Sequence, residues 1–246
     1  MQSFSKKGTN LIKKVKYFGF NIQKLEREQL PVSKEITAAT CDRREFEDKP
    51  LEYYQHLYDN FGDKAEFLVA TLNFQDYRRN LETKAQQLQK ELAPLNKKIA
   101  EGINSAKVNK QKAQLEKQVE KLKVRLEEAQ EFIHKYGTND LILAGSLFIY
   151  LEKEAVYLHS GSYPEFHKFY APTILQEYFM LEAIKRGIPR YNFLGISGYF
   201  DGSDGVLRFK QNFNGYIEQK PGLFIYHPFP IKYKVITTIK RLLGRL

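Results

Sequence analysis

The stretch from Tyr77 to Tyr136 constrains the fold of this chain more than any other part of it. It contains a single proline and a single glycine, and Lys, Glu, Gln and Leu dominate its composition. Apolar or small residues recur in steps of four and three, which places them on one stripe of an α-helix. They are Leu81, Ala85, Leu88, Leu92, Leu95 and Ile99 in the first half, and Val108, Leu115, Val119, Leu122, Leu126, Ala129, Ile133 and Tyr136 in the second, where Lys112 is the one polar interruption.

The segment EGINSAK at 101–107 divides this stretch, because its Gly, Asn and Ser are typical of helix ends and caps. We therefore expect residues 77–137 to fold back as an antiparallel two-helix coiled-coil arm. Each helix would be about 35–40 Å long at ~1.5 Å per residue. Pro94 should kink the first helix by removing one backbone hydrogen bond. A continuous helix in a dimeric coiled coil is the alternative, and the turn signal at Gly102 to Ser105 disfavours it.

The flanking segments mix helical and strand-like patterns, which predicts an α+β fold. We expect helices over 11–18, 31–44, 50–60, 170–187, 205–213 and 231–244, and strands over 19–25, 65–74, 141–151, 154–161, 190–196 and 215–227. This order predicts a discontinuous domain, 1–76 and 138–246, into which the arm 77–137 is inserted.

The charge balance favours an anionic partner. The 246 residues include 39 Lys plus Arg against 29 Asp plus Glu, a net charge of +10 with an isoelectric point near 9.4. Such a balance favours RNA or an anionic lipid surface. A basic protein without a nucleic-acid partner is equally consistent with charge alone.

The single cysteine, Cys41, excludes an intrachain disulfide and a cysteine-based zinc cluster, and it fits a reducing cytoplasm. In the first 18 residues, basic side chains interrupt every apolar run, so neither a signal peptide nor a membrane-spanning helix is predicted there. We expect a cytoplasmic protein whose membrane contact, if it has one, is peripheral at the inner face.

Several common chemistries lack their sequence signatures. The five histidines show no paired spacing with one another or with Cys41, so no metal site is predicted. The chain has no G-x-S-x-G elbow, no Walker loop and no dinucleotide-binding glycine fingerprint. These absences count against hydrolase, nucleotide-hydrolysing and Rossmann enzymes.

The most unusual segment is GISGYFDGSDGVLRFKQNFNG at 195–215, a glycine-rich loop between a strand and a short helix. Loops of this kind frequently hold functional residues. In the short helix Phe209 can pack while Arg208 and Lys210 project, which puts two cations and an aromatic ring beside a flexible loop. A polar connector followed by a solvated basic helix is the alternative interpretation.

The pattern D-x-S-D-G-V-x-R-F-K-x-x-F-N-G-x-x-E at 201–218 resembles the signature segment of the Fem family of non-ribosomal peptidyl transferases. The resemblance extends in weaker form over nearly the whole chain. The helical arm corresponds to the arm that many of these enzymes have, which is similar to that of seryl-tRNA synthetase. Further similar segments are LIKKVKYFGFNIQKL, CDRREFEDKPLEYYQHLYDNFGDKAEFLVATL, AGSLFIYLEKEAVYLHSGSYPEFHKFYAPTILQEYFMLEAI and the final helix.

The resemblance implies a domain like the GNAT acyl-CoA N-acyltransferases, interrupted by the arm. No Q/R-x-x-G-x-G/A phosphate loop occurs, so the sequence disfavours an acyl-CoA donor and no cofactor is expected. The family implies an aminoacyl-tRNA ester as donor. It implies as acceptor the lysine amine of a muramyl-pentapeptide precursor, UDP-linked or lipid-linked, in the synthesis of the peptidoglycan bridge.

The same resemblance implies the site residues. The family's Phe-Lys pair corresponds to Phe209 and Lys210, and a fixed cation near the ester carbonyl can stabilise the negative charge that develops there. Arg208, the second projecting cation, is predicted to bind substrate. Family members use an arginine in the helix containing CDRREF to hold the precursor's phosphates, which implies Arg44, or Arg43 one step away. Family members often have Gly where Glu45 stands.

Family enzymes have roughly another domain before the segment that opens here, so the resemblance implies a truncated gene product or a partner that supplies the remaining domain. Three functions follow as alternatives: a tRNA-dependent aminoacyltransferase, a non-catalytic module that binds tRNA or a partner, and an inert truncation product. The closing residues 231–246 predict an amphipathic helix, which either packs on the body or touches an anionic membrane.

Overall fold

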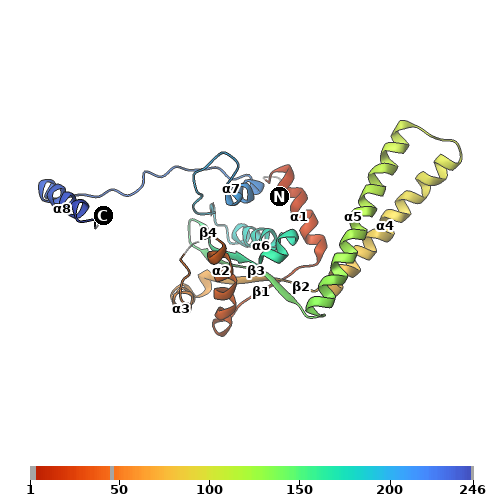
Figure 1. The fold of residues 1–246 in the computed structure, drawn as a ribbon. Coiled ribbons are helices and arrows are strands. Elements are labelled where there is room, and N and C mark those ends of the chain that lie inside the picture. Colours follow the sequence, from red (N-terminus) through yellow and green to blue (C-terminus); the bar gives the residue numbers. More distant parts are fainter. Residues whose placement is uncertain (1–3, 45–46, 245–246) are drawn as a thin grey trace. The chain divides into compact units, whose positions relative to one another are not determined.

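The computed structural model describes residues 4–44 and 47–244 (Figure 1). The chain divides into two compact units, Met1–Asn214 and Gly215–Leu246. The first contains a five-stranded sheet, the helices that cover it and a long helical hairpin. Its strands are β1 (Asn21–Lys24), β2 (Ala65–Leu72), β3 (Leu141–Tyr150), β4 (Ala155–Ser162) and β5 (Tyr191–Asn192).

The helices of the first unit are α1 (Lys6–Phe18), α2 (Leu30–Arg44), α3 (Leu51–Phe61), α4 (Phe74–Ala100), α5 (Ala106–Tyr136), α6 (Ala171–Lys185) and α7 (Gly205–Lys210). Four short 3-10 segments join them: η1 (Arg27–Gln29), η2 (Gly62–Lys64), η3 (Pro164–Phe169) and η4 (Gln211–Phe213). The mixed α+β class predicted from the sequence is confirmed.

The sheet has the strand order β1-β2-β3-β4-β5, and its pairs are antiparallel except for the parallel pair of β4 with β5. All eight residues of β2 are buried because both faces of the sheet are covered. Alternate side chains therefore enter two different cores: Leu68 and Leu72 pack on the side of α1 and α6, and Phe67 and Val69 on the side of α2 and α3.

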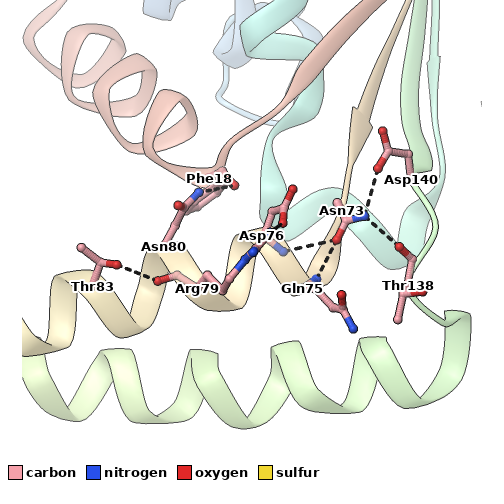
Figure 2. Close-up of polar contacts among 9 residues, drawn as sticks. All are labelled: Phe18, Asn73, Gln75, Asp76, Arg79, Asn80, Thr83, Thr138 and Asp140. Carbon is pink, nitrogen blue, oxygen red and sulfur yellow. Dashed lines mark hydrogen bonds and ion pairs between the residues drawn. The ribbon is translucent and has the colours of Figure 1, made fainter.

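The helical hairpin is inserted between two neighbouring strands of this sheet. Leu72 at the end of β2 lies opposite Leu141 at the start of β3. The next residue, Asn73, caps α4: its Oδ1 accepts from the backbone N–H groups of Gln75 and Asp76 at 3.0 and 3.2 Å. Its Nδ2 donates to the carbonyl oxygen of Thr138 at 2.8 Å and to Asp140 Oδ1 (Figure 2). One side chain thus joins the start of the hairpin to its end.

An aromatic cluster, which we call the aromatic base, fixes the hairpin to the body. Phe74 is fully buried and stacks on Phe132 of α5 with ring centroids 4.7 Å apart. Phe166 and Phe169 of η3 pack against both rings. Aromatic pairs of this kind add to the free energy gained by burial alone. The aromatic base comprises Phe74, Tyr77, Phe132, Phe166 and Phe169.

Beyond the aromatic base, α4 and α5 pack against each other along the apolar stripe read from the sequence. Leu88, Leu95, Leu115 and Leu122 are buried although no part of the sheet lies against the distal hairpin. The helix breaks at 101–105 and α5 returns alongside α4, and Ser105 caps it by accepting from the N–H of Val108. Helix α4 continues through Pro94. Supercoiling of the two helices stays a prediction.

Two sequence predictions on strands are wrong. Residues 215–227 have no regular secondary structure, since the described part of the second unit contains no other strand with which they could pair. The strand predicted over 190–196 shortens to β5, because Leu194 has a φ of 58° and turns the chain away from β4.

The second unit contains the helix α8 (Pro230–Leu242), as the amphipathic pattern predicts. Within this unit His227 stacks on Tyr233, and Lys232 lies over the ring of Phe229. Across the described residues of the chain, no helix is both long enough and apolar enough to cross a membrane.

Phe74→Ala tests the role of the aromatic base. It removes a fully buried ring with partners on three elements, so the free energy of unfolding of the sheet should fall by about 3–5 kcal/mol. Leu95→Ala is the control, because it truncates a buried side chain far along the hairpin. Denaturant unfolding with hydrogen exchange should show lower protection in β2 and β3 for Phe74→Ala, and only local loss for Leu95→Ala. Equal loss in the sheet for both variants would contradict this assignment.

Candidate functional site

The edge of the sheet opens where β4 and β5 part. The two parallel strands pair only at Ala155 with Tyr191 and at Val156 with Asn192. Strand β4 continues to Ser162, whereas β5 ends at Asn192. The side-chain Oδ1 of Asn192 accepts a hydrogen bond from the backbone N–H of Leu194 at 2.8 Å. Backbone groups after Asn192 therefore have no ladder partner and need other ones.

Lys210 supplies those partners. Its Nζ donates to the carbonyl oxygens of Phe193 and Gly195 at 2.6 Å each, and approaches that of Leu194 at 3.4 Å. Carbonyl oxygens are neutral acceptors, so these bonds fix the position of the ammonium group without neutralising its charge. The structure thus places this cation at the point where the two strands diverge.

The glycine-rich loop is held by Asp204. Its Oδ1 accepts from the backbone N–H groups of Val206 and Leu207, which caps α7, and its Oδ2 accepts from Ser197 Oγ at 2.7 Å. These bonds, with that from the Ser197 hydroxyl contributing most, lower the pKa of Asp204 to about 2. Asp201 makes a similar local turn with Ser203. Both carboxylates therefore shape the loop.

Helix α1 holds the other end of the motif. The backbone N–H and the hydroxyl of Ser5 both donate to the carbonyl oxygen of Asn212, at 3.2 and 3.0 Å. Gly8 allows this close approach, because a Cβ at that position would lie 1.9 Å from the same oxygen. Phe4 and Phe213 meet edge to face beside it. The sequence analysis missed Ser5 and Gly8, since nothing local indicates a contact with a segment some 200 residues later.

Phe209 contributes to a small hollow beside the motif. The hollow has a volume of about 120 Å³ and lies between the start of α6, the segment η3 and the ends of β3 and β4. Phe209 also packs edge to face on Phe213. Thr173 in its wall is 1% exposed, and its hydroxyl has no hydrogen-bond partner among the described residues. Phe209 therefore lines the apolar hollow, whereas Lys210, the next residue, faces the backbone carbonyls that follow β5.

The structure describes the remaining predicted site residues only in part. Arg208 is exposed on α7, beside Lys210 in sequence. Arg43 and Arg44 form the last turn of α2, and their side chains lie outside the described part of the structure, as does Glu45. Of the predicted site residues whose side chains the structure describes, Arg208, Phe209 and Lys210 all belong to α7. Among the described residues, no group of three or more His, Cys, Asp or Glu side chains is placed to bind a metal ion.

The chain is similar in sequence to known aminoacyltransferases. The chain is 29% identical over 233 residues to the aminoacyltransferase FemA of Staphylococcus epidermidis, covering 94% of this chain and 56% of the relative. FemA of Staphylococcus aureus is 28% identical, with 95% and 56% covered. The chain thus spans about half the length of the curated relatives it matches.

The crystal structure of FemX superposes with a TM-score of 0.67 at 19% identity, over 87% of this chain and 55% of that one. This likeness shows a shared fold. The FemAB family matches residues 1–241, which include α1, the hairpin, the sheet, the opening beside β5 and all but the last residue of α8. Because the match covers nearly the whole chain and includes the motif that positions Lys210, this chain belongs to the FemAB family.

Proposed function

We propose that this chain provides the donor side of a tRNA-dependent aminoacyltransferase, which adds amino acids to the stem-peptide lysine of a muramyl-pentapeptide precursor in peptidoglycan bridge synthesis. The observation that carries the proposal is the family match over residues 1–241, to relatives named as aminoacyltransferases.

The architecture that goes with this function is a GNAT-like domain, 1–76 and 138–246, with a coiled-coil arm over 77–137. The divergence of β4 and β5 supports it, since an opening between two parallel strands can admit an extended acyl donor. The basic character of the chain supports a tRNA donor.

The reaction is the attack of an amine on an ester carbonyl. The lysine nitrogen of the acceptor forms the new amide bond, and the bond from the carbonyl carbon to the ribose oxygen of tRNA breaks. The amine loses a proton and the ribose oxygen gains one, so no cofactor is needed. Negative charge develops on the carbonyl oxygen in between, and a preorganised cation at that place lowers the barrier.

Lys210 is the residue proposed for this role. Its two bonds of 2.6 Å to backbone carbonyls hold its ammonium group in place, with a longer approach of 3.4 Å to a third carbonyl. Phe209, which lines the apolar hollow beside α7, would help to exclude water from the reacting groups. Water exclusion strengthens the attraction between the ammonium and the developing charge.

Arg208, Arg43 and Arg44 are proposed to bind the substrates. Guanidinium groups form paired hydrogen bonds with phosphate, and the acceptor precursor contains phosphates whether UDP-linked or lipid-linked. Arg208 is exposed next to the proposed catalytic lysine. For Arg43 and Arg44 the support is the family resemblance of the segment CDRREF alone.

A non-catalytic role in tRNA or partner binding is the second candidate function. The observation that favours it is the bonding of Lys210, because three carbonyl contacts are also what a purely structural lysine would make. Mutation of Lys210 distinguishes the two functions.

Lys210→Met keeps most of the aliphatic stem and deletes the charge. We expect turnover to fall by about a hundredfold or more with folding unchanged, the size of effect seen when one oxyanion donor is removed. The measurement uses aminoacyl-tRNA and a muramyl pentapeptide, and compares turnover with thermal unfolding. Near-normal turnover would return the motif to a structural role.

Gly8→Ala tests whether α1 positions this lysine. Alanine normally stabilises a helix relative to glycine by about 1 kcal/mol. Here we expect the opposite sign, because the new methyl group would collide with the Asn212 carbonyl. Turnover should fall while the affinity for tRNA stays within about twofold. A more stable variant with normal turnover would show that the contact is not needed.

We also propose that α8 touches an anionic membrane near a lipid-linked precursor. Val235, Ile236 and Ile239 lie toward one side of the helix, whereas Lys234 and Arg241 lie toward the other. Removal of residues 231–246 should then abolish co-sedimentation with vesicles containing anionic lipid, because each basic residue near such a surface contributes about 1 kcal/mol. Co-sedimentation that is unchanged after the removal would exclude this role.

A further inference from the structure

A second hollow, which we call the basal hollow, lies where the hairpin leaves the body. It has a volume of about 450 Å³ and is bounded by α1, by α4 and α5, and by the end of η3. Its walls are aromatic, with Phe18, Tyr77 and Phe169 among them. It shares Tyr170 with the hollow beside Phe209 but contains no residue of the glycine-rich motif, and the proposed transfer reaction assigns it no role.

Four cations converge on the basal hollow from three elements: Lys14, Lys121, Arg125 and Lys168. Glu128 is the one carboxylate in its lining, and it pairs with Lys168 at 2.9 Å. Lys14 lies over the ring of Tyr170, and Arg125 over that of Phe18. Partial burial, together with the charges of Arg125 and Lys121, lowers the pKa of Lys14. The hollow thus holds excess positive charge that an anion would stabilise.

The charge continues along α5 as a stripe formed by Lys110, Lys117, Lys121 and Arg125. At 3.6 residues per turn these four lie within about 80° of one another on the helix surface, over a length of about 22 Å. Lys110, Lys117 and Lys121 are exposed. Within the described residues, none of the four forms an ion pair with a carboxylate.

The lysines on the opposite side of α5 differ in this respect. Lys112 pairs with Glu116 at 3.6 Å, and Lys123 pairs with Glu120 at 3.6 Å. The acidic residues of this part of the helix therefore neutralise one side and leave the other basic. A line of unneutralised cations that ends in a basic hollow matches a chain of regularly spaced negative charges better than it matches a single small anion.

We propose that the basal hollow binds a phosphate group of an RNA backbone, and that the neighbouring phosphates of the same strand follow the α5 stripe. The proposal deepens the proposed function and rests on it, since the RNA in question is the tRNA donor. It assigns the donor's docking to the base and one face of the hairpin, apart from the opening where transfer would occur.

The test measures binding of unfractionated tRNA to the full chain by fluorescence anisotropy between 50 and 200 mM salt. Lys121→Gln combined with Arg125→Gln should weaken binding about tenfold or more at every salt concentration. It should also reduce the slope of log affinity against log salt by about 1.4–1.8, because two phosphate contacts are lost. Lys112→Gln combined with Lys123→Gln is the matched control: it removes the same charge from the same helix and should change affinity less than about twofold.

Glu128→Gln provides a test in the opposite direction. It removes the carboxylate of the basal hollow and releases Lys168, so tRNA should bind several-fold more tightly. Circular dichroism and thermal unfolding of each variant check that the hairpin is intact. Inorganic pyrophosphate and UDP serve as competitors that represent isolated phosphate groups, and they should displace tRNA only at concentrations that act through ionic strength.

Each outcome decides between the two proposals. Equal losses in both double variants, with tRNA still bound, would overturn the basal hollow as a site and leave the proposed function intact. Specific displacement by pyrophosphate or UDP would overturn the RNA assignment in favour of a small-phosphate site. Absence of tRNA binding by the unmutated chain would overturn this inference and the tRNA donor together.

Discussion

The structure depends on the closure of the hairpin insertion between β2 and β3. Leu72 and Leu141 face each other in the sheet, and the Asn73 side chain bridges the first turn of α4 and the residues that follow α5. Two long helices are therefore inserted beyond the last pair of the ladder, because both ends of the insertion meet at neighbouring backbone positions. The aromatic base then packs the insertion against η3 and α1, which makes the hairpin continuous with one of the two cores. A hairpin attached in this way has a fixed base.

The sequence predicts those elements whose signals are local. Helix or strand geometry alone explains the apolar steps from Leu81 to Tyr136, the break at Gly102 and the alternation in 65–74. The corresponding elements α4, α5 and β2 form at these places. The wrong predictions concern strands, whose formation depends on pairing with another segment. Residues 215–227 alternate like a strand, but the described part of their unit offers no other strand. The length of β5 depends on a turn at Leu194, where a β-carbon makes a positive φ unfavourable and no glycine indicates it in advance.

The same distinction applies to the candidate site. The pattern at 201–218 indicates Phe209 and Lys210 because their spacing belongs to a known family. The structure places Lys210 beside the divergence of β4 and β5 and Phe209 in the wall of the neighbouring hollow. The partners of that motif are contributed by residues far away in sequence, so no periodicity reveals them. Gly8 is an example, since within α1 it is only an unfavourable helix residue. The structure explains why a glycine is needed there, because the Asn212 carbonyl oxygen lies too close for a β-carbon.

Helix α1 connects the two regions to which function is assigned. Its N-terminal end contacts Asn212 of the motif through Ser5 and Gly8, and its last turns line the basal hollow with Lys14 and Phe18. In the last turn Lys16 also pairs at 2.8 Å with Glu177, a residue of α6 that is 2% exposed. The helix has 13 residues and is about 20 Å long. A helix held at both ends does not bend easily, so it sets a fixed separation between the hairpin base and the opening beside Lys210. For a donor that docks through its phosphates at one end and reacts at its terminal ester, such a fixed separation is a positioning device, because it orients the ester before the amine arrives.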